Sequence, residues 1–238
     1  RITQLGGGLA STSAYFKVER KSGEIAYYGQ DADARVIPSG VTVPLTWMIK
    51  SVQDRSGNAM HYGYIDYGDG EVLISNIWYT GTVSTLGTRR VAFTYEDRPS
   101  GVGTNDRASS YLAGGLTRQT KRLTAVTTFV GTEAVRSLVL TYALSIGTGR
   151  SLLQTATDCA HDGTNWVCRP PTDFTWQEGA PTYQFKSLPT LTSEDGQLDL
   201  TRLARLETAG DYNGDGAAES ARTPANARGT GYEDYPGG

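Results

Sequence analysis

The sequence is poor in the residues on which most catalytic and metal sites depend. Its 238 residues include two cysteines and two histidines. They contain no Gly-x-Ser-x-Gly, His-Glu-x-x-His, phosphate-loop or dinucleotide-binding motif. No stretch approaches the ~20 apolar residues that are needed to cross a bilayer. The 22 lysines and arginines nearly balance the 25 aspartates and glutamates, and the net charge of −3 argues against nucleic-acid binding.

Helical periodicity is also missing before residue 190, and the composition favours strands instead. The chain has 29 glycines and 14 tyrosines, many threonines and serines, and only 20% charged residues. Apolar residues alternate with period two in short runs separated by glycine-containing turns, a pattern typical of half-buried strands. The runs are residues 15–20, 24–28, 46–52, 59–66, 71–79, 89–96, 122–130, 135–144 and 151–157. They predict an all-β fold, an antiparallel meander, sandwich or barrel.

The chain is expected to divide into two domains. Residues 98–115 lack alternation and are interpreted as a long surface loop. A polar stretch with Pro181 and Pro189 indicates a linker, so we predict a β domain over residues 1–180, a linker over 181–195 and part of a second domain over 196–238. The chain opens without methionine and closes without a recognisable element, and we interpret it as a piece of a longer protein.

The two cysteines, Cys159 and Cys168, flank the turn residues Asp162-Gly163. Alternation on both sides of the turn brings the two sulfur atoms face to face across adjacent strands. A disulfide is the preferred interpretation, and it implies an oxidising compartment. The alternative is a pair of reduced, buried side chains.

Candidate catalytic side chains are few. His61 lies in an alternating run and His161 in a turn, which favours surface positions for both. The carboxylates of Asp66, Asp69, Glu71 and Glu96 could form a glycosidase pair. Carboxylates near turns are nevertheless ordinary on a β-protein surface, so we predict no enzymatic activity.

The sharpest local signal is a cation-binding pattern in residues 211–219. Asp211, Asn213, Asp215 and Glu219 offer side-chain oxygens at the first, third, fifth and ninth positions, and Ala217 offers its carbonyl. Oxygen ligands at this spacing, with glycine at the sixth position, suit Ca²⁺. The twelfth position is an arginine and no amphipathic helix follows, which excludes an EF-hand. The sequence therefore predicts a calcium loop within a β-hairpin, the alternative being a tight turn without metal.

A tight turn is also expected at residues 54–58. The side chain of Asp54 can accept backbone N–H bonds from two residues further on, while Gly57 and Asn58 are expected to adopt positive φ. Tyr62 and Tyr64 then lie on one face of the strand that follows.

Several strings, taken in order, resemble the SpvB-like N-terminal region of Tc insecticidal toxin B components and of related Rhs (YD-repeat) proteins. The strings are residues 47–64, 74–80, 91–99, 121–123, 140–142, 149–153 and 170–176. Residues 211–219 are similar to the calcium loop of the FG-GAP/VCBS propeller blades that follow this region in the same proteins, although the ninth position there is usually aspartate. The resemblance implies a β shell followed by a partial propeller-like blade.

The resemblance implies a non-catalytic scaffold in a large secreted bacterial toxin-associated protein. Its partners would be other regions of the same chain, an enclosed toxic C-terminal polypeptide and a pore-forming toxin subunit. The rival hypothesis is a carbohydrate- or cell-surface-binding module in which Trp47, Trp78 or Trp166 stacks on sugar rings. Against it, Trp47, Trp78 and Trp176 occupy expected inward strand positions.

Overall fold

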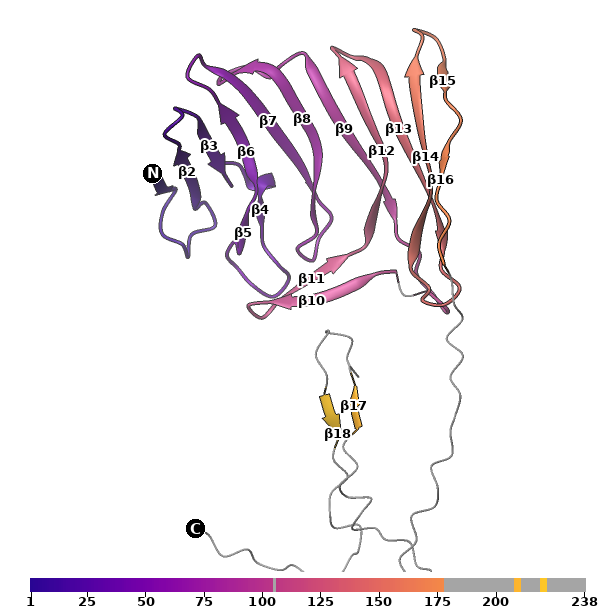
Figure 1. Ribbon diagram of the computed structural model, residues 1–238. Helices are drawn as coiled ribbons and strands as arrows, with labels where there is room; N and C mark the ends of the chain where they lie inside the picture. Colours follow the sequence, from indigo (N-terminus) through magenta and orange to yellow (C-terminus); the bar gives the residue numbers. More distant parts are fainter. Residues whose placement is uncertain (105, 178–207, 211–218, 222–238) are drawn as a thin grey trace, which may run out of the picture. The chain divides into compact units, whose positions relative to one another are not determined.

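The chain divides into two units, Arg1–Pro181 and Thr182–Gly238, and the first holds nearly all of the described structure (Figure 1). The computed structural model describes residues 1–104, 106–177, 208–210 and 219–221. Within these ranges, no helix has the length and apolarity needed to cross a membrane. The predicted linker and most of the predicted C-terminal blade lie outside the described residues.

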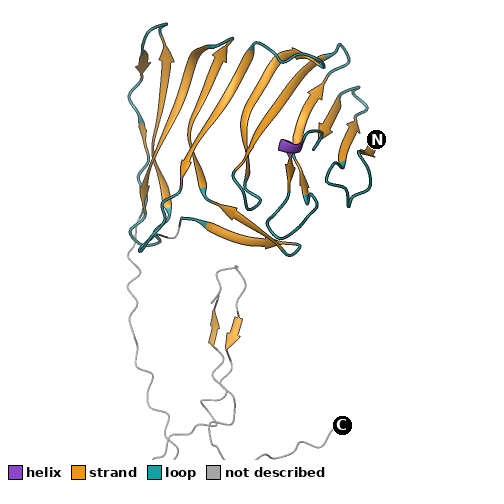
Figure 2. Cartoon of the chain, turned by 180° about the vertical axis from the view of Figure 1, so that it is seen from behind, coloured by secondary structure: helices purple, strands orange, loops and turns teal. Residues whose placement is uncertain are grey.

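The first unit is built on one twelve-stranded antiparallel sheet that is not closed into a barrel (Figures 1 and 2). Each strand pairs with the strand of the sheet that precedes it in the chain. The exception is β16, which pairs with β14 and not with β15. The fold is therefore all-β, as predicted, and a meander. Its strands are β1 (Ile2–Leu5), β2 (Tyr15–Glu19), β3 (Ile25–Tyr28), β6 (Ile49–Gln53), β7 (Asn58–Asp66), β8 (Val72–Thr82), β9 (Arg89–Asp97), β12 (Lys121–Val130), β13 (Glu133–Leu144), β14 (Ser151–His161), β15 (Trp166–Cys168) and β16 (Thr172–Asp173).

The turn between β6 and β7 forms by the mechanism that its sequence predicts. Asp54 Oδ1 accepts hydrogen bonds from the backbone N–H groups of Ser56 at 2.8 Å and Asn58 at 2.9 Å. Gly57 has the expected positive φ of 84°. The prediction for Asn58 was wrong, because this residue is already the first of β7 and is not among those with positive φ.

A short excursion between β3 and β6 covers part of one face of the sheet. It contains a 3₁₀ turn, η1 (Ala32–Ala34), and the paired strands β4 (Arg35–Val36) and β5 (Thr46–Trp47). Ala34 is buried against Tyr64 of β7 and Val72 of β8, and this cluster is the hydrophobic core. Asp33 of η1 accepts a hydrogen bond from the Tyr64 N–H at 3.2 Å, while the Tyr64 hydroxyl donates to the Ile49 carbonyl at 2.6 Å. Burial of the ring raises the pKa of Tyr64 to about 12.

The segment interpreted as a surface loop instead contains most of a hairpin. Residues 98–115 include β10 (Ala108–Leu112) and the first residue of β11 (Gly115–Gln119), which pairs with it. All five residues of β10 are exposed. The strand has no buried face, so its sequence lacks the alternation of apolar and polar residues from which strands are predicted. β11 is bonded to the loop after β4 through Leu116 and Ser39, whose N–H groups donate to each other's carbonyls at 2.8 and 3.1 Å.

The two faces of the sheet differ in chemistry between β9 and β14. Residues that pair directly across strands share a face, so Phe93, Val126 and Leu138 form one row. The apolar face, as we name it, carries Val91, Phe93, Val126, Leu138, Leu140 and Ala156, and among them Thr128 and the ion pair of Arg136 with Asp158. The opposite face, which we name the threonine face, carries Thr94, Thr127, Ser137, Thr141, Thr155 and Thr157, together with Ala92, Ala125, Val139 and Cys159.

The excursion lies on the same side as the apolar face, where Ala34 packs against β7 and β8 and Asp33 pairs with Lys50 of β6. Tyr62, which packs against the core, pairs with Ile77, and Ile77 pairs with Val91. Among the described elements, β9, β12, β13 and β14 mainly contact their neighbours in the sheet. Leu138 on this face is 40% exposed. The apolar face thus continues beyond the core as a half-exposed surface.

The turn of the β10–β11 hairpin predicts a stabilising substitution. Ala113 has φ 47° and Gly114 has φ 83°, so a residue with a Cβ occupies the left-handed region. Ala113→Gly is expected to raise the free energy of unfolding by about 0.5 kcal/mol, measured by urea denaturation. In the control, Gly114→Ala meets no atom within 4 Å, and backbone strain alone is expected to cost about 1 kcal/mol. Equal stabilities for both variants and the parent would contradict this account of the turn.

Candidate functional site

Three of the four acidic residues considered for catalysis are held in turns and surface ion pairs. Asp66 Oδ1 accepts the Gly68 N–H at 2.8 Å and closes the turn after β7. Asp69 pairs with Arg118 at 2.8 Å, and Glu96 pairs with Arg122 at 2.6 Å. Each carboxylate has a structural partner, and these contacts join neighbouring parts of one end of the sheet.

The fourth acidic residue, Glu71, is buried with 5% exposure. Its carboxylate accepts hydrogen bonds from the N–H of Thr120 at 2.8 Å and from the N–H of Lys121 at 2.9 Å. It also accepts one from the Thr120 hydroxyl. These bonds fasten the end of the β7–β8 hairpin to the point where β11 passes into β12. Glu71 therefore anchors one base of the β10–β11 hairpin.

Asp106, just before β10, anchors the other base. Its side chain is 3% exposed and lies 3.2 Å from Arg98 Nη1 and 4.0 Å from Arg122 Nη1. It accepts the Ser151 N–H at 2.6 Å and also the Ser151 hydroxyl. Burial raises the pKa of Asp106, but the two Ser151 hydrogen bonds and the two guanidinium charges outweigh it and hold the pKa below the ordinary 3.8. Sequence reasoning missed this residue because its partner is 45 positions away.

Neither histidine is set in a catalytic constellation. His61 Nε2 lies 2.9 Å from the Thr82 carbonyl oxygen across the β7–β8 ladder. His161 Nδ1 accepts the Gly163 N–H at 3.2 Å, and its ring packs edge-on against Trp166. Within the described ranges, no group of three or more His, Cys, Asp or Glu side chains is placed to hold a metal ion.

The tryptophans fall into two pairs. Trp47 packs edge-on against Phe16 and donates to the Ala14 carbonyl at 2.7 Å, and Trp78 lies over Gly63, so both are half-buried as structural residues. Trp166 is 43% exposed. Trp176 is 52% exposed, which overturns its predicted inward position. Its ring nitrogen donates to the Leu153 carbonyl at 2.7 Å, outside any core.

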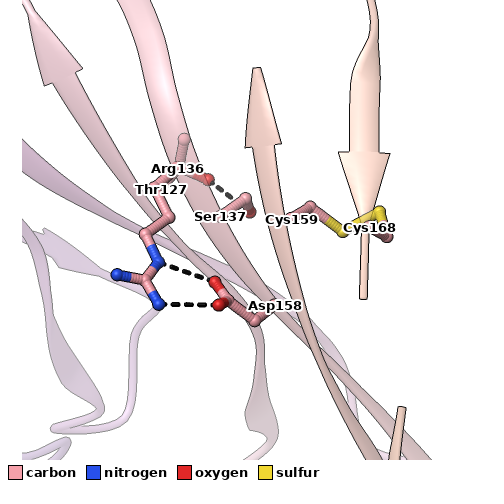
Figure 3. The surroundings of a disulfide bond; sticks show 6 residues. All are labelled: Thr127, Arg136, Ser137, Asp158, Cys159 and Cys168. Atoms are coloured by element: carbon pink, nitrogen blue, oxygen red, sulfur yellow. Dashed lines mark hydrogen bonds and ion pairs between the residues drawn. A yellow bond between two sulfur atoms is a disulfide. The ribbon is translucent and has the colours of Figure 1, made fainter. Parts of the chain in front are cut away.

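Cys159 and Cys168 are joined by a disulfide across β14 and β15 (Figure 3). The two residues are paired directly in the ladder, and their Cα atoms are 3.9 Å apart. The flanking bond from the Arg169 N–H to the Asp158 carbonyl shows that the cysteines occupy a non-hydrogen-bonded position. Side chains approach most closely at such positions in antiparallel pairs. On the two strands beyond β14, the hydroxyl oxygens of Ser137 on β13 and Thr127 on β12 lie 2.9 Å apart.

The calcium-loop residues Asp211, Asn213, Asp215 and Ala217 lie outside the described residues. The short strands that flank them are β17 (Thr208–Gly210) and β18 (Glu219–Ala221). These strands pair antiparallel, with Gly210 opposite Glu219. The ends of the segment are thus brought together as in a hairpin, a geometry that suits a cation-binding loop. The metal site itself stays a prediction.

Comparisons with known proteins bear on the resemblance inferred from the sequence. Residues 1–81 match the model of a family described as Salmonella virulence plasmid 65kDa B protein, SpvB. The SpvB-like resemblance is thereby confirmed, whereas the FG-GAP/VCBS-type blade stays a prediction. No curated protein matches the chain.

Solved structures share the fold of this chain at low sequence identity. The crystal structure of TcdB2-TccC3 aligns with TM-score 0.64 and 15% identity over 94% of this chain and 13% of that one. The Photorhabdus luminescens Tc holotoxin pore aligns with TM-score 0.62 and 16% identity over 90% and 12%. The N-terminal domain of the effector SpvB from Salmonella typhimurium strain LT2 aligns with TM-score 0.52 and 15% identity over 63% and 62%. The chain therefore spans only part of each similar structure.

The buried Asp106 predicts a loss of stability and a change in acid sensitivity. Replacing it by asparagine removes a charge that accepts two bonds from Ser151 and faces two arginines, which is expected to cost about 2 kcal/mol at pH 7. Because the folded pKa lies below 3.8, the stabilising contribution of Asp106 is present above pH 3.8 and is lost as the pH falls through the folded pKa. Denaturant titrations of Asp106→Asn should show a weaker acid dependence.

The matched control for this prediction is Asp97→Asn. Asp97 pairs with Lys121 at 2.6 Å, but its side chain is 67% exposed, so a much smaller loss is expected. If both variants lost the same stability, burial of the Asp106 network would not be what stabilises the hairpin.

Proposed function

We propose that this chain is a non-catalytic scaffold segment of a large bacterial toxin-associated protein. The observation that carries the proposal is the twelve-stranded open meander, which shares its fold with TcdB2-TccC3 and whose first 81 residues match the SpvB family. A wide sheet of sequential hairpins is suited to enclosing a space, because each strand is hydrogen-bonded only to the strands beside it. It offers a surface for building a wall and requires no reactive centre.

The contacts of the acidic side chains support a structural role. Glu71 and Asp106 are buried with all their strong acceptors engaged by backbone N–H groups, hydroxyls or guanidinium groups. A general acid or base must instead have a proton-transfer position free for a substrate. Both carboxylates serve to fix the β10–β11 hairpin at the end of the sheet.

We further propose that the sheet forms part of a secreted shell around a toxic polypeptide of the same assembly. The half-exposed apolar side chains of this face over β9, β12, β13 and β14 support this, since a partner that covers them would remove them from water, although the Arg136–Asp158 ion pair lies on the same face. In this view the other partners are further regions of the same long chain and a pore-forming toxin subunit.

The shell proposal predicts that the complete gene product shields a polypeptide from proteolysis. The intact protein should retain a fragment that proteinase K degrades only after denaturation, followed by gel electrophoresis and mass spectrometry. Val126→Pro removes an N–H from the β12 ladder in the middle of the sheet and is expected to expose that fragment. The control Val126→Thr keeps a β-branched residue in the strand and should preserve protection.

Degradation of every fragment in the unaltered protein at the rate seen after denaturation would overturn enclosure. Binding to a glycan array that is lost with Trp166→Ala, but kept with Val126→Thr, would favour the carbohydrate-binding module instead.

We also propose that residues 211–219 bind one Ca²⁺ through Asp211, Asn213, Asp215, Glu219 and the Ala217 carbonyl. The antiparallel pairing of Gly210 with Glu219 supports this assignment, because it sets the two ends of the loop side by side. Bound Ca²⁺ would neutralise the cluster of carboxylates and tighten the hairpin.

The calcium proposal predicts uptake of one equivalent of Ca²⁺ by the chain, with a Kd on the order of 10⁻⁴ M, as in extracellular modules. Isothermal titration calorimetry measures it directly. Asp215→Ala should abolish binding, while Asp234→Ala, an acidic change outside the loop, should leave it unchanged. Absence of heat and of any Ca²⁺-dependent change in stability would leave a metal-free turn as the correct interpretation.

A further inference from the structure

The disulfide-bonded strand β15 is attached to the sheet by few interactions. It has three residues, all exposed, and pairs with β14 alone. The ladder pairs are Cys159 with Cys168, Ala160 with Val167 and His161 with Trp166. A strand this short at the edge of a sheet is marginal without additional attachment.

The chain that follows β15 leaves the ladder after Arg169, whose N–H donates to the Asp158 carbonyl at 2.9 Å. Pro170 and Pro171 have no N–H to donate, and pairing resumes only where Thr172 of β16 meets Ala156. β16 has its own support, because the Phe174 N–H donates to the Gln154 carbonyl at 2.9 Å. The two prolines therefore separate β15 from β16, and either strand can detach while the other stays paired.

Besides the disulfide and the paired residues, Arg169 attaches this end of β15 to Asp158 twice. Its N–H donates to the Asp158 carbonyl at 2.9 Å, and its guanidinium forms an ion pair with the Asp158 carboxylate. Arg169 Nη1 lies 3.8 Å from Asp158, and its side chain is 81% exposed. Asp158 is already engaged by Arg136 in a bidentate pair at 2.7 and 2.6 Å. A long, exposed contact to a shared carboxylate contributes little. The covalent bond is thus the dominant attachment of β15.

The two cysteine residues differ in exposure. Cys159 is buried with 4% exposure, whereas Cys168 belongs to the exposed strand. A thiolate can therefore approach the Cys168 sulfur, form a mixed disulfide there and displace Cys159 as the leaving thiolate. A second thiol then releases Cys168. Two reductant thiols become one disulfide, and both cysteines end as thiols.

We propose that the Cys159–Cys168 disulfide is a redox-controlled latch on the edge of the sheet. In an oxidising medium it holds β15 over the outer edge of β14. When a cellular thiol such as glutathione reduces it, β15 detaches between the turn at Asp162-Gly163 and Pro170, while β16 and the rest of the sheet stay paired. The uncovered edge at residues 159–161 then offers free ladder groups to another extended strand.

Hydrogen exchange with and without reductant tests the latch. In the oxidised chain the amides of residues 160 and 167 should be protected, and millimolar glutathione should speed their exchange about tenfold or more. Amides of β7, β8 and β16 should keep their rates. Mass spectrometry confirms reduction by the gain of two hydrogens. The double variant Cys159→Ser/Cys168→Ser should exchange at the rates of the reduced chain, and glutathione should not change those rates.

The control Arg169→Ala removes the exposed ion pair and leaves the disulfide, so it should retain protection until glutathione is added. Three outcomes would overturn the proposal. They are a disulfide that glutathione cannot reduce in the folded chain, unchanged exchange at residues 160 and 167 after verified reduction, and simultaneous loss of protection in β7 and β8. Loss of protection in β7 and β8 would mean that the disulfide stabilises the whole sheet. None of these readouts depends on shell formation or calcium binding.

Discussion

The backbone ladder between strands that follow one another in the chain is the interaction on which the rest of this structure depends. Each hairpin turn sets the register of the next pair, and the register decides which side chains share a face. Phe93, Val126 and Leu138 meet in one row only because two consecutive strand pairings, β9 with β12 and β12 with β13, agree. A slip by one residue would move the apolar residues to the threonine face. Bulges, such as the one between Gly63 and Tyr64, change the register locally without reversing this arrangement.

A single-layer sheet has little interior, so this protein concentrates its burial in a few places. The cluster of Ala34, Tyr64 and Val72 forms where the excursion covers β7 and β8. At the end of the sheet, burial serves polar groups instead, and Glu71 and Asp106 bind backbone N–H groups of distant segments. Hydrogen-bonded carboxylates do there what apolar packing does in a thicker fold. They fix an inserted hairpin that has no buried face of its own.

The sequence predicts those features that repeat locally. Alternation located the long strands because each has a half-buried face, and Asp54 identified its turn because both bonds close within four residues. β10 was not predicted because all its residues are exposed. The role of Asp106 was not predicted because its partner Ser151 is distant in the chain. Trp176 was misplaced for a related reason. The last strand, β16, ends at Asp173, so Trp176 lies beyond the paired part of the sheet. Alternation along the sequence therefore does not place its side chain on a buried face.

The edges of an open sheet need protection from unwanted pairing, and this requirement connects the scaffold with the disulfide. On the edge that follows β14, Pro170 and Pro171 offer no N–H donors, and the cross-link holds β15 over the ladder groups beyond them. The prolines lack these donors in any medium, whereas the latch that we propose covers the edge only while the disulfide is oxidised. The bond lies beyond the last long strand, so breaking it opens an edge without disturbing the register that all other contacts need.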